Sequence, residues 1–284
     1  MLNLRQNSKN FWIVALISAL MLVLIAEQRS HRKLLNNIRN TFEAIGEKNN
    51  LDNRRLLNFL SMPSDKIVNI GCAKFYVPNY PIDLIQSEIV DDGTFYEVGL
   101  LEELQPYIKK NAVILDIGAN IGNHSIYWAV KTDAKRIYSF EPVKDFFKIL
   151  QKNVEINNLT NKIKILNIGL SDKKINGSIS SYDRTNIGGT HVKQDPNGNL
   201  LLDKLDNIKI EENAVDFVKI DVEGHELKVL QGARETLLKY RPTIFIETFP
   251  DKRLEVHEYL TNLGYHLEKS FAGSNYLYVS NLPR

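Results

Sequence analysis

The sequence predicts a doubly wound α/β fold around a mostly parallel sheet. Short apolar runs typical of buried parallel strands alternate with stretches of helical periodicity, and this alternation indicates βαβ units. The strands are expected at 112–116, 136–140, 163–168, 215–221 and 243–247, with helices at 122–130, 144–157 and 224–239. After a helix at 254–263, the tail has strand patterns at 265–269 and 276–279, which predict an antiparallel hairpin at the C-terminal edge of the sheet. Before the first strand, a hairpin is expected within 66–77 and a helix at 88–108.

The turn after the first strand carries the most informative motif, Asp116-Ile-Gly118-Ala-Asn120-Ile-Gly122. Open α/β sheets bind ligands where a strand passes through a glycine-rich turn into a helix. A dinucleotide-binding turn needs Gly-x-Gly-x-x-Gly, so that a pyrophosphate rests on the helix N-terminus. This turn has one glycine fewer, and its acid would repel phosphate. The motif therefore favours S-adenosylmethionine, which carries an ammonium and a sulfonium but no phosphate.

A second acid supports the same cofactor. Glu141 ends the second strand, where an acid can accept hydrogen bonds from both ribose hydroxyls. Asp172, which follows the third strand, is assigned to the cofactor site with Asp116, Gly118, Asn120, Gly122 and Glu141. Taken singly, Asp116 or Glu141 would also be explained as a turn or helix-capping residue.

The fourth strand ends in a concentration of ionisable residues, Lys219-Ile-Asp221-Val-Glu223-Gly-His-Glu226. Such a cluster is costly unless its charges pair, and clusters of this kind tend to mark active sites. We expect Asp221 to act as the base or orienting group, with Lys219 fixing it. Glu223 and Glu247 could hold acceptor hydroxyls or, with Asp221, a divalent ion, and these alternatives stay open.

The polar stretch 182–191 is a candidate lid or acceptor-binding loop. Within it, Asn186 is assigned to acceptor binding and His191 is a candidate catalytic base. The composition argues against a nucleic-acid partner, because 36 basic and 34 acidic residues nearly balance. The single cysteine, Cys72, excludes an intrachain disulfide.

These residues resemble the FkbM family of S-adenosylmethionine-dependent methyltransferases over about residues 88–250. The matching segments, in order, are Asp116–His124, Phe140–Pro142, Asn186–Gly189, Leu202–Leu205, Lys219–Glu226, Val229–Ala233 and Arg241–Glu247. The resemblance implies a class I methyltransferase (Rossmann-like) fold with a seven-stranded sheet whose last strand is antiparallel. It also implies methylation of a hydroxyl oxygen on a sugar, glycan, glycolipid or polyketide. One departure is Leu201, where family members often have threonine before Leu202-Asp203.

The N-terminus predicts a membrane anchor. The run 11–26 has no charge and is about 16 residues long, whereas a spanning helix typically needs about 20. A signal peptide is the competing interpretation, but only Ala26 offers a small residue at a suitable cleavage point. We therefore expect an anchor at 1–30 with a single transmembrane helix, a helical stem at 31–62 and a methyltransferase domain at 63–284. The protein should then lie in a membrane, in an orientation that the flanking charges do not settle.

Two other functional classes remain open at this stage. One is a nicotinamide-dependent oxidoreductase, against which the missing third glycine counts. The other is a membrane-tethered binding protein that keeps the fold without catalysis, against which the retained Lys219, Asp221 and Glu223 count.

Overall fold

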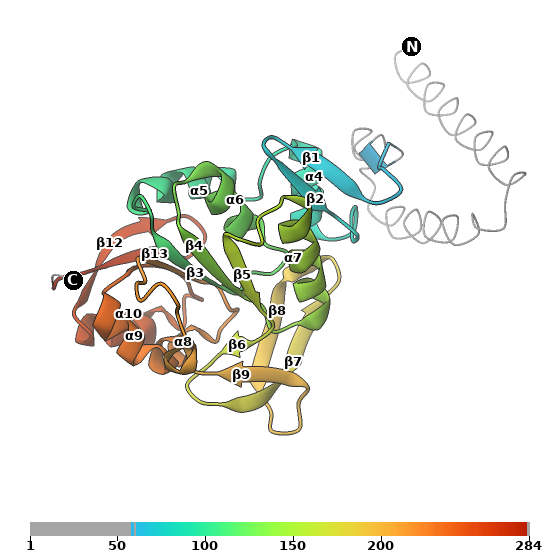
Figure 1. The fold of residues 1–284 in the computed structure, drawn as a ribbon. Coiled ribbons are helices and arrows are strands. Elements are labelled where there is room, and N and C mark those ends of the chain that lie inside the picture. Colours follow the sequence, from blue (N-terminus) through green and yellow to red (C-terminus); the bar gives the residue numbers. More distant parts are fainter. Residues whose placement is uncertain (1–57, 60, 283–284) are drawn as a thin grey trace, which may run out of the picture. The chain divides into compact units, whose positions relative to one another are not determined.

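The structure is a computed structural model that describes residues 58–59 and 61–282 (Figure 1). Its centre is a seven-stranded sheet with the strand order β12-β13-β11-β10-β3-β4-β5. The strands are β3 (Val113–Ile117), β4 (Arg136–Phe140), β5 (Ile163–Leu166), β10 (Phe217–Ile220), β11 (Thr243–Glu247), β12 (Tyr265–Phe271) and β13 (Asn275–Ser280). Only β13 runs antiparallel to its neighbours β11 and β12. The expected parallel strands and the C-terminal hairpin are therefore present.

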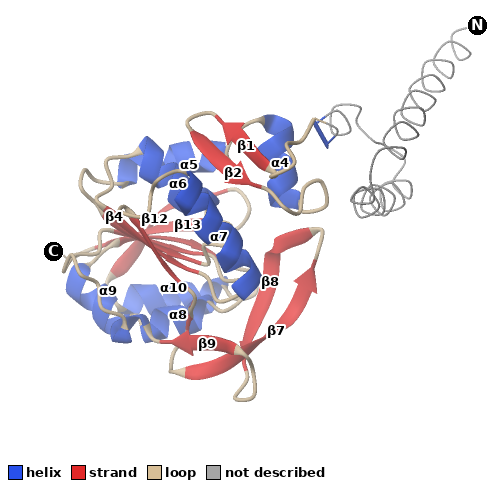
Figure 2. Ribbon diagram, turned by 45° about the vertical axis from the view of Figure 1, so that its right-hand side comes forward, coloured by secondary structure: helices blue, strands red, loops and turns tan. Residues whose placement is uncertain are grey.

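Helices cover both faces of this sheet (Figure 2). One layer holds α5 (Val98–Leu104), α6 (Asn123–Lys131) and α7 (Lys144–Ile156), and the other holds α8 (Glu226–Gly232), α9 (Arg234–Tyr240) and α10 (Arg253–Asn262). The strand residues divide accordingly between two hydrophobic cores: Ile114 packs in one, and Val113 and Leu115 pack in the other. Burial on both sides explains why the central strands read as continuous apolar runs.

Two predicted helices are interrupted in the structure. The segment expected to be one helix at 88–108 forms α4 (Leu84–Asp92), α5 and the short 3-10 helix η1 (Gln105–Tyr107). The break after α4 occurs because Gly93 adopts a left-handed conformation that ends the helix. The segment expected at 224–239 is divided into α8 and α9 at Ala233, directly after Gly232, which lies close to the backbone of Ser171.

The β1–β2 hairpin, Ile67–Ile70 and Ala73–Tyr76, is a separate two-stranded sheet, as the sequence predicted for 66–77. Asn153 of α7 connects it to the turn after β3. Its side chain accepts a hydrogen bond from the Tyr76 amide at 2.6 Å and donates one to the Ile121 carbonyl at 2.9 Å. A single buried amide thus ties the hairpin to the glycine-rich turn.

A second sheet, which the sequence did not predict, stands beside the carboxyl edge of the main one. It has the order β6-β9-β7-β8, with β6 (Gly169–Leu170), β7 (Ile175–Asp183), β8 (Asn186–Gln194) and β9 (Leu200–Asp203). The polar segment expected to be a loop at 182–191 is therefore the turn and second strand of the long β7–β8 hairpin (Figure 1).

The β7–β8 hairpin is clamped to α4 near its turn. Asp83, which is fully buried, accepts hydrogen bonds from the Gln86 amide at 3.0 Å, as the α4 N-cap, and from the Ile187 amide at 3.0 Å. The Leu84 amide donates to the Thr185 carbonyl at 2.8 Å. One aspartate therefore joins segments about 100 residues apart and fixes the position of β8.

The prediction of a transmembrane helix and a single-pass membrane location is corrected. Among residues 58–59 and 61–282, no helix is long and apolar enough to cross a bilayer. The predicted anchor at 1–30 lies outside the described residues, and its uncharged run is shorter than the roughly 20 residues that a spanning helix needs. The division into 31–62 and 63–284 stays a prediction, since nearly all of the stem also lies outside the described part.

Candidate active site

A cavity of about 240 Å³ lies at the carboxyl ends of β3, β4, β10 and β11. From β3 the sheet order continues to β4 and β5 on one side and to β10 and β11 on the other, and such a point of divergence is where open α/β sheets bind ligands. The segment before α5 and the strand β8 complete the walls. Eight of the predicted site residues line this cavity: Gly118, Asn120, Glu141, Asn186, Lys219, Asp221, Glu223 and Glu247.

Gly118 is required by a close approach between β3 and β10. Its φ is +82°, and a Cβ atom there would lie 1.8 Å from the carbonyl oxygen of Asp221. The Gly118 amide donates to the Phe140 carbonyl at 3.1 Å, so the turn is also fixed to the end of β4. Any side chain at this position would push the turn away from Asp221.

Asp116 and Lys219 form a buried pair beneath the turn. Asp116 is 0% exposed, accepts a hydrogen bond from the Ser125 hydroxyl at 2.5 Å, and places Oδ1 3.4 Å from Lys219 Nζ. Lys219 Nζ also donates to the Gly118 carbonyl at 2.8 Å and lies 3.1 Å from Asp221 Oδ2. Asp116 therefore supports the site from below and does not line the cavity, although the sequence placed it in the cofactor pocket.

The electrostatics of Lys219 favour the charged amine. Burial alone would lower the pKa of Lys219, but the negative charges of Asp221 and Asp116 and the hydrogen bond with Asp221 raise it above its ordinary value. The ammonium group thus remains protonated and holds the Asp221 carboxylate in one orientation.

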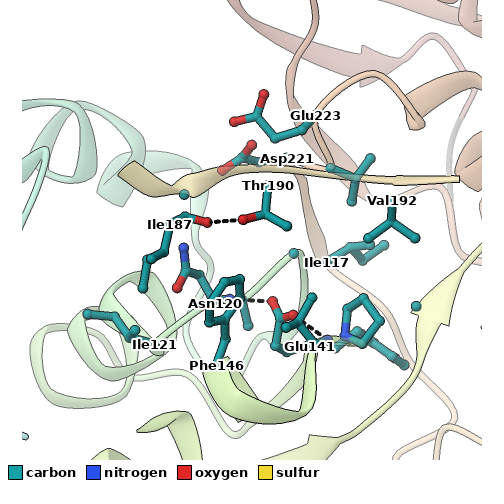
Figure 3. Close-up of a pocket in the computed structure, with 18 of the residues that line it drawn as sticks. Ile117, Asn120, Ile121, Glu141, Phe146, Ile187, Thr190, Val192, Asp221 and Glu223 are labelled. Atoms are coloured by element: carbon teal, nitrogen blue, oxygen red, sulfur yellow. Dashed lines mark hydrogen bonds between the residues drawn. The ribbon is translucent and has the colours of Figure 1, made fainter. Parts of the chain in front are cut away.

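Glu141 projects from the end of β4 and holds the turn through its backbone. Its carboxylate accepts hydrogen bonds from the Asn120 amide at 3.0 Å and the Val143 amide at 2.7 Å (Figure 3). Burial raises the pKa of Glu141 to about 7, although both amide hydrogen bonds oppose this shift. Carboxylate oxygens carry more lone pairs than these two bonds use, so Glu141 can also accept from hydroxyls of a ligand.

The opposite side of the cavity is acidic. Asp221 and Glu223 lie there, away from Glu141 (Figure 3), and Glu247 and Glu97 also line the wall. Burial, followed by the charges of neighbouring acids, raises the pKa of Glu223 to about 7 and that of Glu247 to about 8. Glu223 lies in the loop after β10, where its backbone is left-handed with a φ of +51°.

Four predicted residues lie outside the cavity wall. Asp116 is beneath the turn, and Gly122 is the N-cap of α6. His191 stacks on Phe249, with ring centroids 5.7 Å apart and an interplanar angle of 3°. Asp172 accepts hydrogen bonds from Ser171 and Gln194, so it braces the second sheet against the loop after β6. The cavity therefore contains Asn186 of the polar segment and leaves out His191.

The structure adds Tyr96, Glu97 and His124, which the sequence reasoning did not assign to the site. His124 Nε2 lies 3.4 Å from Glu97 Oε2. Burial raises the pKa of Glu97, but the hydrogen bond and charge of His124, with the charge of Lys219, lower it below its ordinary value. The only sequence signal for this pair was His124 in the motif after β3, because Glu97 fell inside a segment expected to be helical.

Within the described part of the chain, no group of three or more histidine, cysteine, aspartate and glutamate side chains is arranged to hold a metal ion. Of the two roles left open for Asp221, Glu223 and Glu247, the structure thus gives no support to the divalent ion.

Comparison with known proteins identifies the family. A model of the methyltransferase FkbM domain matches residues 116–267, which is more than half of the chain. The chain belongs to the FkbM methyltransferase family. Its reaction uses S-adenosylmethionine as methyl donor, and this sets aside the nicotinamide-dependent alternative.

The chain is similar in sequence or structure to several other methyltransferases. The chain is 24% identical over 203 residues to methyltransferase sdnD of Sordaria araneosa, covering 58% of this chain and 78% of that protein. It is 32% identical over 144 residues to the hexuronic acid methyltransferase AglP of Haloferax volcanii, covering 49% of this chain and about half, 55%, of AglP. The crystal structure of a methyltransferase FkbM from Methylobacillus flagellatus KT matches with a TM-score of 0.46 and 16% identity, over 89% of this chain and 71% of that one.

The cavity fits S-adenosylmethionine on its own features. The Asn120 Oδ1 atom is buried without a hydrogen-bond partner in a side chain that lines the cavity, so it is available to a ligand. Glu141 can accept from the ribose hydroxyls, and the turn at Gly118 lines the cavity beside it.

Proposed function

We propose that this FkbM protein is an O-methyltransferase that methylates a hydroxyl of a carbohydrate, either a free sugar, a glycan or the sugar of a glycolipid. The observation that carries the proposal is the set of carboxylates on the cavity wall opposite Glu141, the residue assigned to the cofactor. Among them, Asp221 Oδ2 lies 3.1 Å from Lys219 Nζ. Carboxylates accept hydrogen bonds from hydroxyl groups, and several of them together suit a polyhydroxylated acceptor. The relative AglP, a hexuronic acid methyltransferase, supports the choice of a sugar.

Each residue has a defined task in this proposal. Glu141 holds the ribose, and Asn120 with the turn at Gly118 shapes the cofactor pocket. Bound S-adenosylmethionine supplies an electrophilic methyl group on its sulfonium. Lys219 acts as a positioning residue, because its ammonium is buried and fixes Asp221. Asp221 orients the acceptor hydroxyl, and Asn186 with Glu223 binds neighbouring groups of the sugar. Holding two reactants in line removes much of the entropic barrier to a bimolecular transfer.

The proposal is tested in two steps with the full chain. Calorimetric titration with S-adenosylmethionine, with NADH as a parallel control, establishes that the protein binds its donor. Transfer of a radiolabelled methyl group is then measured with a panel of methyl glycosides, uronic acids and glycolipids, and the product bond is identified by mass spectrometry. We expect an ether at a sugar hydroxyl. Transfer to nitrogen, or to non-carbohydrate acceptors only, would contradict the proposal.

The variant Asp221→Asn separates catalysis from binding. Asp221 and Glu141 lie on opposite sides of the cavity (Figure 3), and the proposal assigns the cofactor ribose to Glu141. We therefore expect turnover to fall at least 100-fold while the dissociation constant for S-adenosylmethionine changes less than about threefold. A loss of donor binding in this variant would place Asp221 in the cofactor pocket. A wild-type chain that binds the donor yet methylates no acceptor would favour the non-catalytic alternative.

A further inference from the structure

Resting on the proposed function, we infer that Glu247 is the general base that removes the proton of the acceptor hydroxyl, while Asp221 orients that hydroxyl. The first observation is the position of Glu247 in the seven-stranded sheet. Glu247 is the last residue of β11, and the parallel register pairs Ile220 of β10 with Ile246 of β11. Asp221, directly after β10, and Glu247 therefore leave adjacent parallel strands side by side, and both line the cavity.

The two acids differ in their partners. Asp221 Oδ2 lies 3.1 Å from the Lys219 ammonium. A proton arriving on Asp221 would cancel this ion pair and leave the buried ammonium with less compensation, which is unfavourable. The Glu247 side chain forms no hydrogen bond or ion pair with the described residues, so both of its carboxylate oxygens are available to a ligand. Of these two neighbouring acids, Glu247 is the one that can take up a proton without breaking an existing contact.

The charges around Glu247 also favour its role as the base. The groups that face it are Asp221 and Glu223 after β10, Glu97 and Tyr96 before α5, and the Lys219 ammonium. Burial and the three negative charges favour the protonated form of Glu247 and raise its pKa to about 8, against the opposing effect of Lys219. A general base works best when its pKa is close to the operating pH, because it is then both largely deprotonated and a good proton acceptor.

Glu223 is the competing base, since it also lacks a hydrogen bond or ion pair with the described residues. It follows Asp221 by two positions in a loop and lies beyond Asp221 as seen from Glu141, on which the cofactor ribose is placed (Figure 3). That position suits a more distant hydroxyl of the sugar. Glu247, in contrast, is fixed by the ladder of β11 between β10 and β13. A base held on a strand is positioned more precisely than one held on a loop.

The acceptor oxygen forms a bond to the methyl carbon, and the carbon–sulfur bond breaks with its electron pair going to sulfur, which loses its positive charge. The acceptor proton moves to an oxygen of Glu247, and the products are a methyl ether, neutral S-adenosylhomocysteine and a protonated carboxyl. Solvent then removes this proton before the next cycle.

The first test needs no acceptor. Carbon-13 NMR of the full chain labelled at the glutamate δ-carbons is recorded from pH 4 to pH 9, for wild type and for Glu247→Gln. We expect the signal that disappears in the variant to titrate above pH 6.5. Titration of that signal near the ordinary glutamate pKa, about 4.3, would overturn the inference.

The second test uses an acceptor found in the transfer assay. We expect Glu247→Gln to lower kcat at least 100-fold, to leave the dissociation constant for S-adenosylmethionine within about twofold, and to abolish the ionisation seen above neutral pH in kcat/KM. Glu223→Gln should mainly raise the KM for the acceptor and keep that ionisation. The surface variant Glu255→Gln is the control, because Glu255 is exposed on α10, where its side chain forms a surface ion pair with Lys252.

The outcomes separate the two proposals. Methyl transfer with an unchanged pH profile in Glu247→Gln would overturn the role of Glu247 alone. If the ionisation disappears in Glu223→Gln instead, the base is Glu223. Absence of transfer by a wild-type chain that binds the donor would overturn the proposed function and the role of Glu247 with it.

Discussion

Gly118→Ala should destabilise the protein far more than the matched change Gly93→Ala. Both glycines adopt left-handed conformations, with φ values of +82° and +65°. A Cβ atom at Gly93 would meet nothing within 4 Å, whereas one at Gly118 would lie 1.8 Å from the Asp221 carbonyl oxygen. The pair therefore separates the backbone strain of an alanine from the cost of the close approach.

The expected difference follows from the contacts at Gly118. The left-handed conformation costs an alanine about 1–2 kcal/mol at either position. At Gly118 the separation must also grow from 1.8 Å to at least 3.0 Å. This displacement acts on the Asp221 amide, which donates to the Ile117 carbonyl at 3.1 Å, and on the Lys219 bond to Gly118 at 2.8 Å. Losing these two bonds costs about 3 kcal/mol more, because one of them carries a charge.

Thermal unfolding of the full chain measures this difference. At about 2–4 °C per kcal/mol for a domain of this size, Tm should fall by roughly 10 °C or more in Gly118→Ala and by about 4 °C in Gly93→Ala. Calorimetry should also show that Gly118→Ala loses S-adenosylmethionine binding and that Gly93→Ala keeps it. Equal Tm values for the two variants would refute the argument from the close approach.

Two further predictions concern protonation. Burial raises the pKa of Glu141 to about 7, and its ionised form is the one that accepts from ribose, so affinity for S-adenosylmethionine should increase from pH 6 to pH 8. Glu141→Gln should weaken binding about tenfold and flatten this dependence in calorimetry; unchanged affinity would remove Glu141 from the cofactor site. For stability, the pKa values of Glu141, Glu223 and Glu247 are raised to about 7, 7 and 8, so the folded state without ligand binds more protons than the unfolded chain. Its unfolding free energy should therefore fall as pH rises from about 6.5 to about 8. His225, whose pKa is lowered by burial to about 4, opposes this trend only below its ordinary value of about 6.5. Thermal unfolding at constant ionic strength checks the sign, and a Tm that increases over this pH range would contradict it.

The parallel sheet could be predicted because its strands are buried on both faces. Residues such as Val113, Ile114 and Leu115 are all less than 2% exposed, so they read as an uninterrupted apolar run. The second sheet gave no such signal. Strand β7 is mostly exposed and rich in serine, and its pairing with β8 has irregular register, so neither an apolar run nor a clear alternation of polar and apolar residues marks it.

The residues of the candidate site also differ in whether the sequence could place them. Asp221, Glu141 and Glu247 could be placed together because each ends a parallel strand, and such ends meet at one edge of the sheet. Glu97 could not, because its position depends on a long-range contact. The Asn123 side chain accepts a hydrogen bond from the Tyr96 amide at 3.0 Å and donates to the Tyr96 carbonyl at 2.9 Å, which brings that segment onto the start of α6. A local pattern of residues in the sequence does not indicate such a long-range contact.

The sheet that contains β7 and β8 contributes to the cavity wall without pairing with the main sheet. Its four strands, β6, β9, β7 and β8, hydrogen-bond to one another. None of them pairs with a strand of the seven-stranded sheet. Mutations that reshape the hairpin therefore leave the register of the donor-binding strands intact, as long as Asp83 keeps its bond to Ile187. Changes in the hairpin can thus reshape the part of the cavity wall that β8 forms, while the pairing of the strands that end at Glu141, Asp221 and Glu247 stays the same.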